Sequence, residues 1–279
     1  MRQYALGGAS GGLVGLTLGL FGGGSILAVP LMVYLVGVPT AHMAIGTSAF
    51  AVAANAGTSL FAHARRGNVK WRCAMMFSLA GVAGALLGSS VGKAIDGQKL
   101  LYLFALLTTA VGALMLKGRG RREDSDAECT LQKAPRVLSF GAATGAFSGF
   151  FGIGGGFLIV PGLVASTGMP MLMAVGSSLV AVTAFGLTTA LNYAASGYVD
   201  WPLALIFVAG GTVGGLLGTA LACRLAGGKG VLNMAFAGLI FAVATYMIVK
   251  SGAALEDACR LNLAAKQEER LVSGPRSWR

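Results

Sequence analysis

The chain has 279 residues, of which 55% are hydrophobic and only 11% are charged, and its mean hydropathy is +0.74. An ordinary soluble domain carries about 25% charged residues, so this composition excludes a soluble globular protein. The net charge of +11 does not indicate a nucleic-acid partner, because the basic residues are scattered between apolar stretches. The expected environment is the lipid bilayer, which a helix of about 20 apolar residues can span.

Apolar stretches follow one another along the chain, and charged residues, glycines or prolines separate them. The first half predicts spans near residues 4–36, 40–64, 72–95 and 98–116. The second half predicts spans near residues 137–167, 170–194, 201–224 and 230–249. Between the halves, residues 117–136 carry too many charges for lipid and are expected to form a solvated linker.

These stretches predict an all-α integral membrane protein with about eight transmembrane helices in two tandem four-helix repeats. The predicted parts are a first transmembrane repeat at 1–116, a charged cytoplasmic linker at 117–136, a second transmembrane repeat at 137–250 and a cytoplasmic tail at 251–279. The second half repeats the first at an offset of 130 or 131 residues. GLFGGGSILAVP at 19–30 matches GFFGIGGGFLIVP at 149–161, and IGTSAFAVAA at 45–54 matches VGSSLVAVTA at 175–184.

The orientation of the repeats depends on the number of crossings in each. Short loops rich in Lys and Arg stay in the cytoplasm. With four crossings per repeat, the repeats run parallel, and both termini share the cytoplasmic side with residues 65–71, 117–136 and 195–200. The only basic residues then on or near the other side are Lys93, Lys99, Arg224 and Lys229. If the interrupted first segment of each repeat re-enters, the parity changes and the repeats are inverted.

Glycine triplets interrupt the first segment of each repeat, and a proline follows each of them. The triplets are Gly22, Gly23 and Gly24 in the first half and Gly154, Gly155 and Gly156 in the second. Non-helical backbone at membrane depth persists only where protein or a water-filled cavity meets it. A helix that restarts after each triplet offers free N–H groups and a positive dipole end to an anion. A tight turn between two packed segments is the alternative interpretation.

Hydroxyl and amide side chains near these breaks are candidate substrate contacts. Thr47-Ser48 and Ser177-Ser178 begin the second span of each repeat, although such hydroxyls can simply bond their own backbone. Asn55 lies two turns beyond Ser48, and its amide is costly in lipid without a partner or cavity. The predicted substrate-binding residues are Gly22, Gly23, Gly24, Ser25, Gly46, Thr47, Ser48, Asn55, Gly154, Gly155, Gly156, Gly176, Ser177 and Ser178.

Other motifs bear on packing and chemistry. Glycines four residues apart favour close helix packing, and the two longest ladders are Gly7, Gly11, Gly15 and Gly19 and Gly141, Gly145 and Gly149. Exposed glycine seams permit a homodimer. The four cysteines show no CxxC pairing, and the sequence contains no HExxH, P-loop or GxSG motif, so we expect no enzyme activity, cofactor or metal.

The doubled segments GLFGGG and GFFGIGGG, each followed by Val-Pro, and the G-[TS]-S and RRGNVKW motifs resemble the TauE/SafE sulfite exporter family over residues 7 to about 249. The resemblance implies about eight spans in two four-span repeats and a substrate region around the breaks and the G-[TS]-S starts. It also implies a small anionic substrate such as sulfite or a sulfonate. One departure is Lys70, which stands where the second copy has Asp200.

The leading hypothesis is therefore a secondary transporter that exports sulfite or a short organosulfonate across the cytoplasmic membrane of a bacterium. An anion channel or uniporter, or an importer of another small carboxylate or sulfur-containing anion, is the alternative within the same class. A membrane scaffold without cargo belongs to a different class and does not require the twin breaks.

Overall fold

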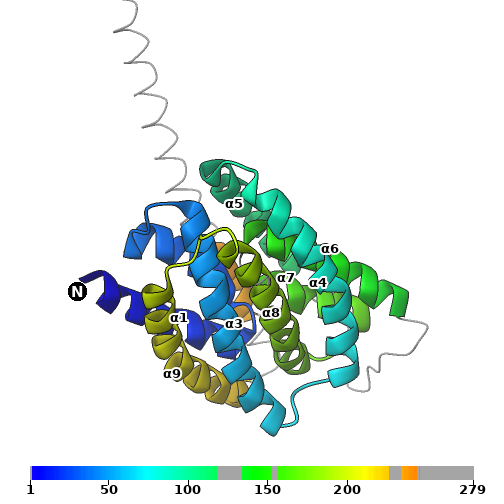
Figure 1. The fold of residues 1–279 in the computed structure, drawn as a ribbon. Coiled ribbons are helices and arrows are strands. Elements are labelled where there is room, and N and C mark those ends of the chain that lie inside the picture. Colours follow the sequence, from blue (N-terminus) through cyan, green and yellow to red (C-terminus); the bar gives the residue numbers. More distant parts are fainter. Residues whose placement is uncertain (1, 118–133, 153–155, 226–233, 244, 246–279) are drawn as a thin grey trace, which may run out of the picture.

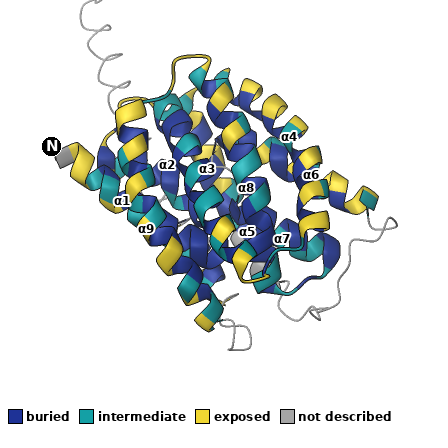
Figure 2. Cartoon of the chain, turned by 60° about the horizontal axis from the view of Figure 1, so that its bottom comes forward, coloured by how far each residue is buried: buried dark blue, intermediate teal, exposed yellow. Residues whose placement is uncertain are grey.

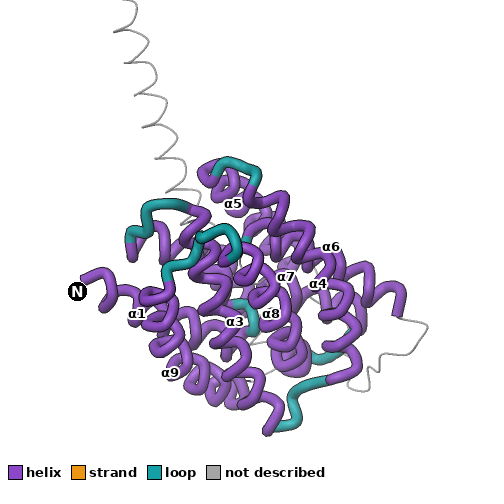
Figure 3. The backbone as a smooth tube through the Cα atoms, viewed as in Figure 1, coloured by secondary structure: helices purple, strands orange, loops and turns teal. Residues whose placement is uncertain are grey.

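The computed structural model describes the chain except for residues 1, 118–133, 153–155, 226–233, 244 and 246–279 (Figure 1). The described part is helical, with short connections and no strand (Figure 3). Its first half contains α1 (Arg2–Phe21), η1 (Gly24–Leu27), α2 (Ala28–Pro30), η2 (Leu31–Val36), α3 (Ala41–Arg65), α4 (Trp71–Lys93) and α5 (Gly97–Lys117). Its second half contains α6 (Ala134–Phe151), α7 (Gly156–Thr167), α8 (Met171–Ala194), α9 (Trp201–Leu225) and a helix at Met234–Val243.

Five described helices are long and apolar enough to cross a membrane: Gln3–Phe21 within α1, and α3, α4, α8 and α9. Shorter apolar helices include Gly24–Val36, which combines η1, α2 and η2, and α7. The outer helices present large apolar side chains, with Leu79 and Leu87 of α4 being 70% and 72% exposed. Figure 2 shows the exposed residues on the outside of the bundle and the buried ones in its middle. The predicted all-helical membrane protein is confirmed, and the count of eight spans stays a prediction.

The first predicted span is two helices that meet at a sharp turn. Gly22 has a φ of 67°, a left-handed conformation that glycine adopts without steric cost. The segment after the turn comes back beside α1, because a side chain at Gly24 would overlap Thr17 and Leu18. Gly152 repeats this conformation at the second break with a φ of 66°. Gly24–Val36 and α7 are therefore half-helices that turn back and pack beside the helices they follow, α1 and α6.

Two glycine seams hold the bundle together, and each joins the two halves of the chain. A methyl group at Gly11, Gly15 or Gly19 of α1 would overlap the backbone of α9, and the same holds for the ladder of α6 against α4. Figure 1 shows these two pairs, α1 with α9 and α4 with α6, on either side of α3 and α8. The predicted packing seams are confirmed. Their partners come from the opposite half, which glycine spacing does not indicate.

The central helices α3 and α8 run in opposite directions. The backbone N–H of Asp200, just after α8, donates to Thr47 near the start of α3 (2.9 Å). The N–H of Lys70, just after α3, donates in the same way to Ser177 near the start of α8 (2.9 Å). The loop that ends each helix therefore lies at the beginning of the other. The corresponding helices of the two halves are antiparallel, and the expected parallel orientation is wrong.

The expected placement of the loops changes accordingly. Residues 195–200 lie on the same side as the start of α1, where Gly7 faces Leu203, and residues 66–70 lie on the opposite side. The loops change sides because the chain turns back at each glycine break, and this reverses the direction of the helices that follow. The tail at 251–279 lies outside the described residues. Since Arg65, Arg66, Lys70 and Arg72 gather around residues 66–70, we expect that side to be cytoplasmic and the start of α1 to lie outside.

Candidate functional site

The two glycine breaks meet inside the bundle. Ser25, which is fully buried, accepts a hydrogen bond at Oγ from the backbone N–H of Gly156 (3.2 Å). A methyl group at Gly156 would overlap the Gly22 carbonyl oxygen, and one at Gly23 would lie 3.1 Å from the Cα atom of Phe157. The N-terminal ends of Gly24–Val36 and α7 therefore lie against each other. Gly154 and Gly155, the other predicted residues of this break, lie outside the described residues.

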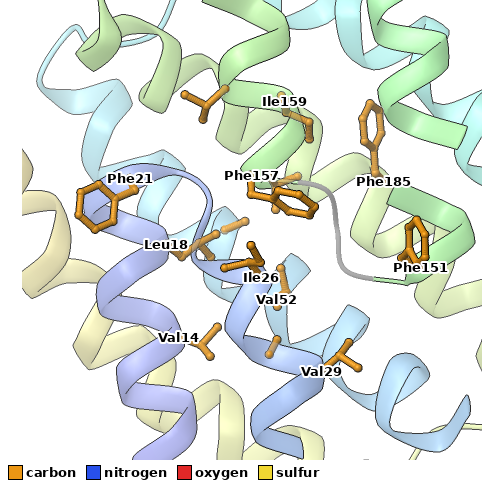
Figure 4. Close-up of a cluster of buried hydrophobic side chains, with 14 of the residues drawn as sticks. Val14, Leu18, Phe21, Ile26, Val29, Val52, Phe151, Phe157, Ile159 and Phe185 are labelled. Atoms are coloured by element: carbon orange, nitrogen blue, oxygen red, sulfur yellow. The ribbon is translucent and has the colours of Figure 1, made fainter. Parts of the chain in front are cut away.

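Aromatic side chains enclose this junction. Figure 4 shows Phe157, at the start of α7, beside Ile26 and the turn that follows Phe21. The outer helices contribute Phe104, whose ring centroid lies 5.8 Å from that of Phe157, and Phe236, 5.6 Å from Phe21. Each of these two rings covers the break of the opposite half. Such an apolar surrounding lowers the local dielectric constant and strengthens any electrostatic interaction at the junction.

The electrostatics of the junction come from backbone dipoles. The first N–H groups of a helix have no acceptor within the helix, and its N-terminal end carries a partial positive charge. Two such ends point into one place here. The basic side chains of the described residues stand at or within one turn of helix ends. The arrangement is therefore suited to a small anion held by neutral donors.

Ser48 and Ser178 lie at the end of the second turn of the central helices α3 and α8, beside the breaks. Their hydroxyls donate to the backbone of their own helices, Ser48 to Ile45 (3.1 Å) and Ser178 to Val175 (2.8 Å). A side chain at Gly22 would lie 2.5 Å from the Ser178 Oγ, and one at Gly152 would overlap Ile45. The second turn of α8 thus borders the first break, and the second turn of α3 borders the second.

Four other predicted residues lie away from the junction. Thr47 and Ser177 accept the loop N–H groups described above, so their hydroxyls hold the loops of the opposite half. Gly46 and Gly176 make room for those loops, because a methyl group would overlap the carbonyl oxygens of Tyr198 and Asn68. These positions form two loop-holding contacts on opposite sides of the bundle.

Asn55 faces α9 and begins a buried polar stripe. A methyl group at Gly211 would overlap its amide, and neither Asn55 Nδ2 nor Oδ1 has a hydrogen-bond partner among the described residues. Ser59 and His63 follow at intervals of four residues on the same face of α3, and all three are fully buried. Sequence reasoning did not single out Ser59 or His63, although their spacing from Asn55 is the signal that relates them.

The described residues hold no group of three or more His, Cys, Asp or Glu that could bind a metal. A half-exposed cation contact joins α4 to the end of α8: Lys93 Nζ donates to Asn192 Oδ1 (2.8 Å) and to Ser196 Oγ (3.0 Å). This contact fastens two helices of opposite halves on the side of residues 195–200.

The chain matches known proteins over most of its length. Residues 8–247 match the family model described as sulfite exporter TauE/SafE. A "probable membrane transporter protein" of Xylella fastidiosa (strain 9a5c) is 54% identical over 248 residues, which is 88% of this chain and 95% of the relative. The "probable membrane transporter protein MJ0441" of Methanocaldococcus jannaschii is 32% identical over 70% of this chain and 78% of its own.

A further relative is the "probable membrane transporter protein YunE" of Bacillus subtilis (strain 168), which is 28% identical over 75% of this chain and 84% of its own. No solved structure matches the chain. The family model covers far more than half of the sequence. The chain therefore belongs to the TauE/SafE family of membrane transporters.

Proposed function

We propose that this protein is a secondary transporter that exports a small oxyanion, sulfite or a short organosulfonate, across the cytoplasmic membrane. The observation that carries the proposal is the meeting of two half-helix N-termini, where Ser25 Oγ accepts from the Gly156 N–H. Broken helices whose N-terminal ends point at an anionic group are the usual construction of substrate sites in secondary transporters.

The Ser25 oxygen marks the position of one anion oxygen. In the described state it takes the Gly156 N–H that an oxyanion would otherwise accept. Hydrogen bonds to an ionised acceptor are roughly twice as strong as those between neutral groups, so an arriving anion can replace this contact. Ser25 and the backbone at Gly22, Gly23 and Gly156 are the residues that we assign to the site.

Neutral donors suit a cargo that has to be released. A fixed Lys or Arg in a low-dielectric site would hold an oxyanion tightly, whereas dipoles and hydroxyls satisfy its oxygens at moderate affinity. Tetrahedral sulfonates and pyramidal sulfite present three oxygens in a small volume. They fit a junction formed by two backbones and one hydroxyl better than a large organic anion does.

The antiparallel arrangement of the two halves favours a transporter over a channel. The half-helices approach the junction from opposite sides of the bundle, so either side can open by movement of one half against the other. A channel has no need for equivalent gates on both sides. In a channel the unidirectional flux rises linearly with concentration.

Purified protein in liposomes tests the proposal. We expect saturable uptake of radiolabelled sulfite and methanesulfonate, with mutual competition and no competition from ammonium. Gly156→Ala pushes the two breaks apart at a cost of about 1–3 kcal/mol, which should lower the flux by roughly 5-fold to 150-fold. Gly57→Ala is the matched control, because its methyl group has only the Thr183 methyl within 4 Å, at 4.0 Å. Equal flux in both variants, or transport of cations, would refute the proposal.

A further inference from the structure

His63, in the last turn of α3, contacts the end of α1, just before the first glycine break. Its Nε2 lies 3.0 Å from the carbonyl oxygen of Gly19, in the last turn of α1 and three residues before Gly22. The side chain is fully buried at this contact. The last four carbonyl groups of a helix have no partner within the helix, so His63 satisfies one of the groups that the break leaves open.

This contact fixes the tautomer of the neutral ring. A carbonyl oxygen only accepts, so Nε2 must carry the hydrogen, and in a neutral imidazole the other nitrogen is then a bare acceptor. His63 Nδ1 is buried and has no hydrogen-bond partner among the described residues. The ring is therefore oriented to take up a proton at Nδ1 without losing its bond to Gly19.

The stripe that continues from His63 is polar and equally unpaired. Ser59 Oγ and both amide atoms of Asn55 have no hydrogen-bond partner within the described part of the chain. Buried polar groups are nearly always paired, with protein or with ordered water, so each exception requires an explanation. These three residues form a buried polar strip from the end of α3 toward its middle, and Asn55 and Ser59 pack against the glycines of α9.

The other half of the protein lacks this proton acceptor. At the offset of 130 residues, Phe185, Thr189 and Tyr193 take the places of Asn55, Ser59 and His63. Tyrosine stays protonated at neutral pH, and histidine is the side chain that titrates in the physiological range. A histidine at this position of the central helix is therefore a feature of the first half and not of the second.

From these contacts we propose that His63 is the proton-coupling residue of this transporter, an inference that rests on the proposed function. A hydronium ion on the side of residues 66–70 gives its proton to the Nδ1 lone pair, which leaves a water molecule and an imidazolium. In the conformation open to the other side, the imidazolium gives this proton to water there, and the neutral ring is restored. The imidazolium stabilises the negative C-terminal end of α1, so protonation favours the conformation in which α1 and His63 touch. No other group changes oxidation state or bonding.

The described charged and titratable groups around His63 include no carboxylate that could accept the proton in its place. On α3 the charged neighbours are Arg65 and Arg66, and on α9 the end of the helix carries Cys223 and Arg224. The Arg66 guanidinium lies 3.8 Å from Cys223 Sγ. Between Tyr4 and Phe21, α1 has no titratable side chain. The described elements packed against this face thus contribute cations and one thiol but no carboxylate.

The test uses the full-length protein in liposomes and methanesulfonate, whose charge does not vary with pH. Two fluxes are measured: exchange of radiolabelled methanesulfonate at equal concentration and pH on both sides, and accumulation driven by an imposed pH difference. The parent should show both. His63→Gln keeps an N–H donor for Gly19 but cannot be protonated, so it should retain exchange and lose the accumulation. His42→Gln, the same change at the only other histidine, should behave as the parent.

The outcomes separate the two proposals. Accumulation by His63→Gln at the level of the parent would overturn the role of His63, and so would loss of accumulation in His42→Gln instead. If His63→Gln fails to insert, a pH dye inside the parent liposomes decides: anion movement without proton movement overturns the inference. A parent that exchanges no anion at all would remove the proposed function and this inference with it.

Discussion

Replacing Gly15 by alanine should weaken the bundle, whereas the same change at Gly12 should not. The two glycines lie in the same helix, three residues apart. A methyl group at Gly15 would overlap the Gly211 carbonyl oxygen and lie 2.6 Å and 2.7 Å from its carbonyl carbon and Cα atom. A methyl group at Gly12 would meet only the Gly210 oxygen, at 3.6 Å, which is an ordinary contact. Backbone atoms cannot rotate away, so α1 and α9 must separate in the first variant.

The expected size of the effect follows from this comparison. Alanine favours a helix over glycine by about 0.8–1.0 kcal/mol, and both variants gain this amount. Overpacking typically costs about 1–3 kcal/mol, so Gly15→Ala should be less stable than Gly12→Ala by about that amount. The bilayer supplies little hydrophobic force between helices, and close packing therefore carries most of their association.

Equilibrium unfolding in mixed micelles with increasing SDS, followed by tryptophan fluorescence, measures the difference. Gly145→Ala repeats the experiment at the second seam, where the methyl group would overlap the Gly81 carbonyl oxygen, and should give a change of the same sign. If Gly15→Ala and Gly12→Ala unfold at the same SDS fraction, α1 does not pack on α9 as the structure describes.

Two further predictions concern the topology and the loop contacts. In intact cells, an impermeant maleimide should label Ala195→Cys but should reach Arg66→Cys only after permeabilisation, and labelling of both from one side would contradict the antiparallel halves. Thr47→Ala leaves the N–H of Asp200 without its acceptor and should destabilise the protein by about 1–3 kcal/mol in the same SDS assay, while Thr47→Ser restores it. Equal stability of the alanine and serine variants would show that the loop contact contributes nothing.

The long helices could be predicted from the sequence because polar or charged residues bound their apolar stretches. The expected spans at 40–64, 72–95 and 201–224 differ from α3, α4 and α9 by at most two residues at either end. The same signal cannot show direction. A Gly-rich interruption indicates where a helix ends but not whether the chain crosses or turns back. The sequence therefore left parallel and inverted repeats open, and the turn seen in the structure favours the inverted arrangement.

The candidate site was predictable in part for a similar reason. Paired glycine breaks indicate non-helical backbone, and the structure places Gly22, Gly23 and Gly156 together. The sequence could not show which hydroxyl of each pair lies at the breaks. Thr47 and Ser48 are equally suitable as substrate contacts in the sequence, and only the fold shows that Thr47 accepts a loop N–H. His63 was missed since its partner, the Gly19 carbonyl, is a backbone group that leaves no trace in the sequence.

The junction between the half-helices is closed by a weak contact, and this weakness is consistent with turnover. A hydrogen bond between neutral groups contributes only about 0.5–1.5 kcal/mol net, whereas one to a charged group contributes about 1.5–3 kcal/mol. Exchanging the Ser25 oxygen for an anion oxygen at the Gly156 N–H is therefore favourable by about 1 kcal/mol per bond. For the anion transport that we propose, a difference of this size lets an anion compete with Ser25 for the Gly156 N–H and still leave the site.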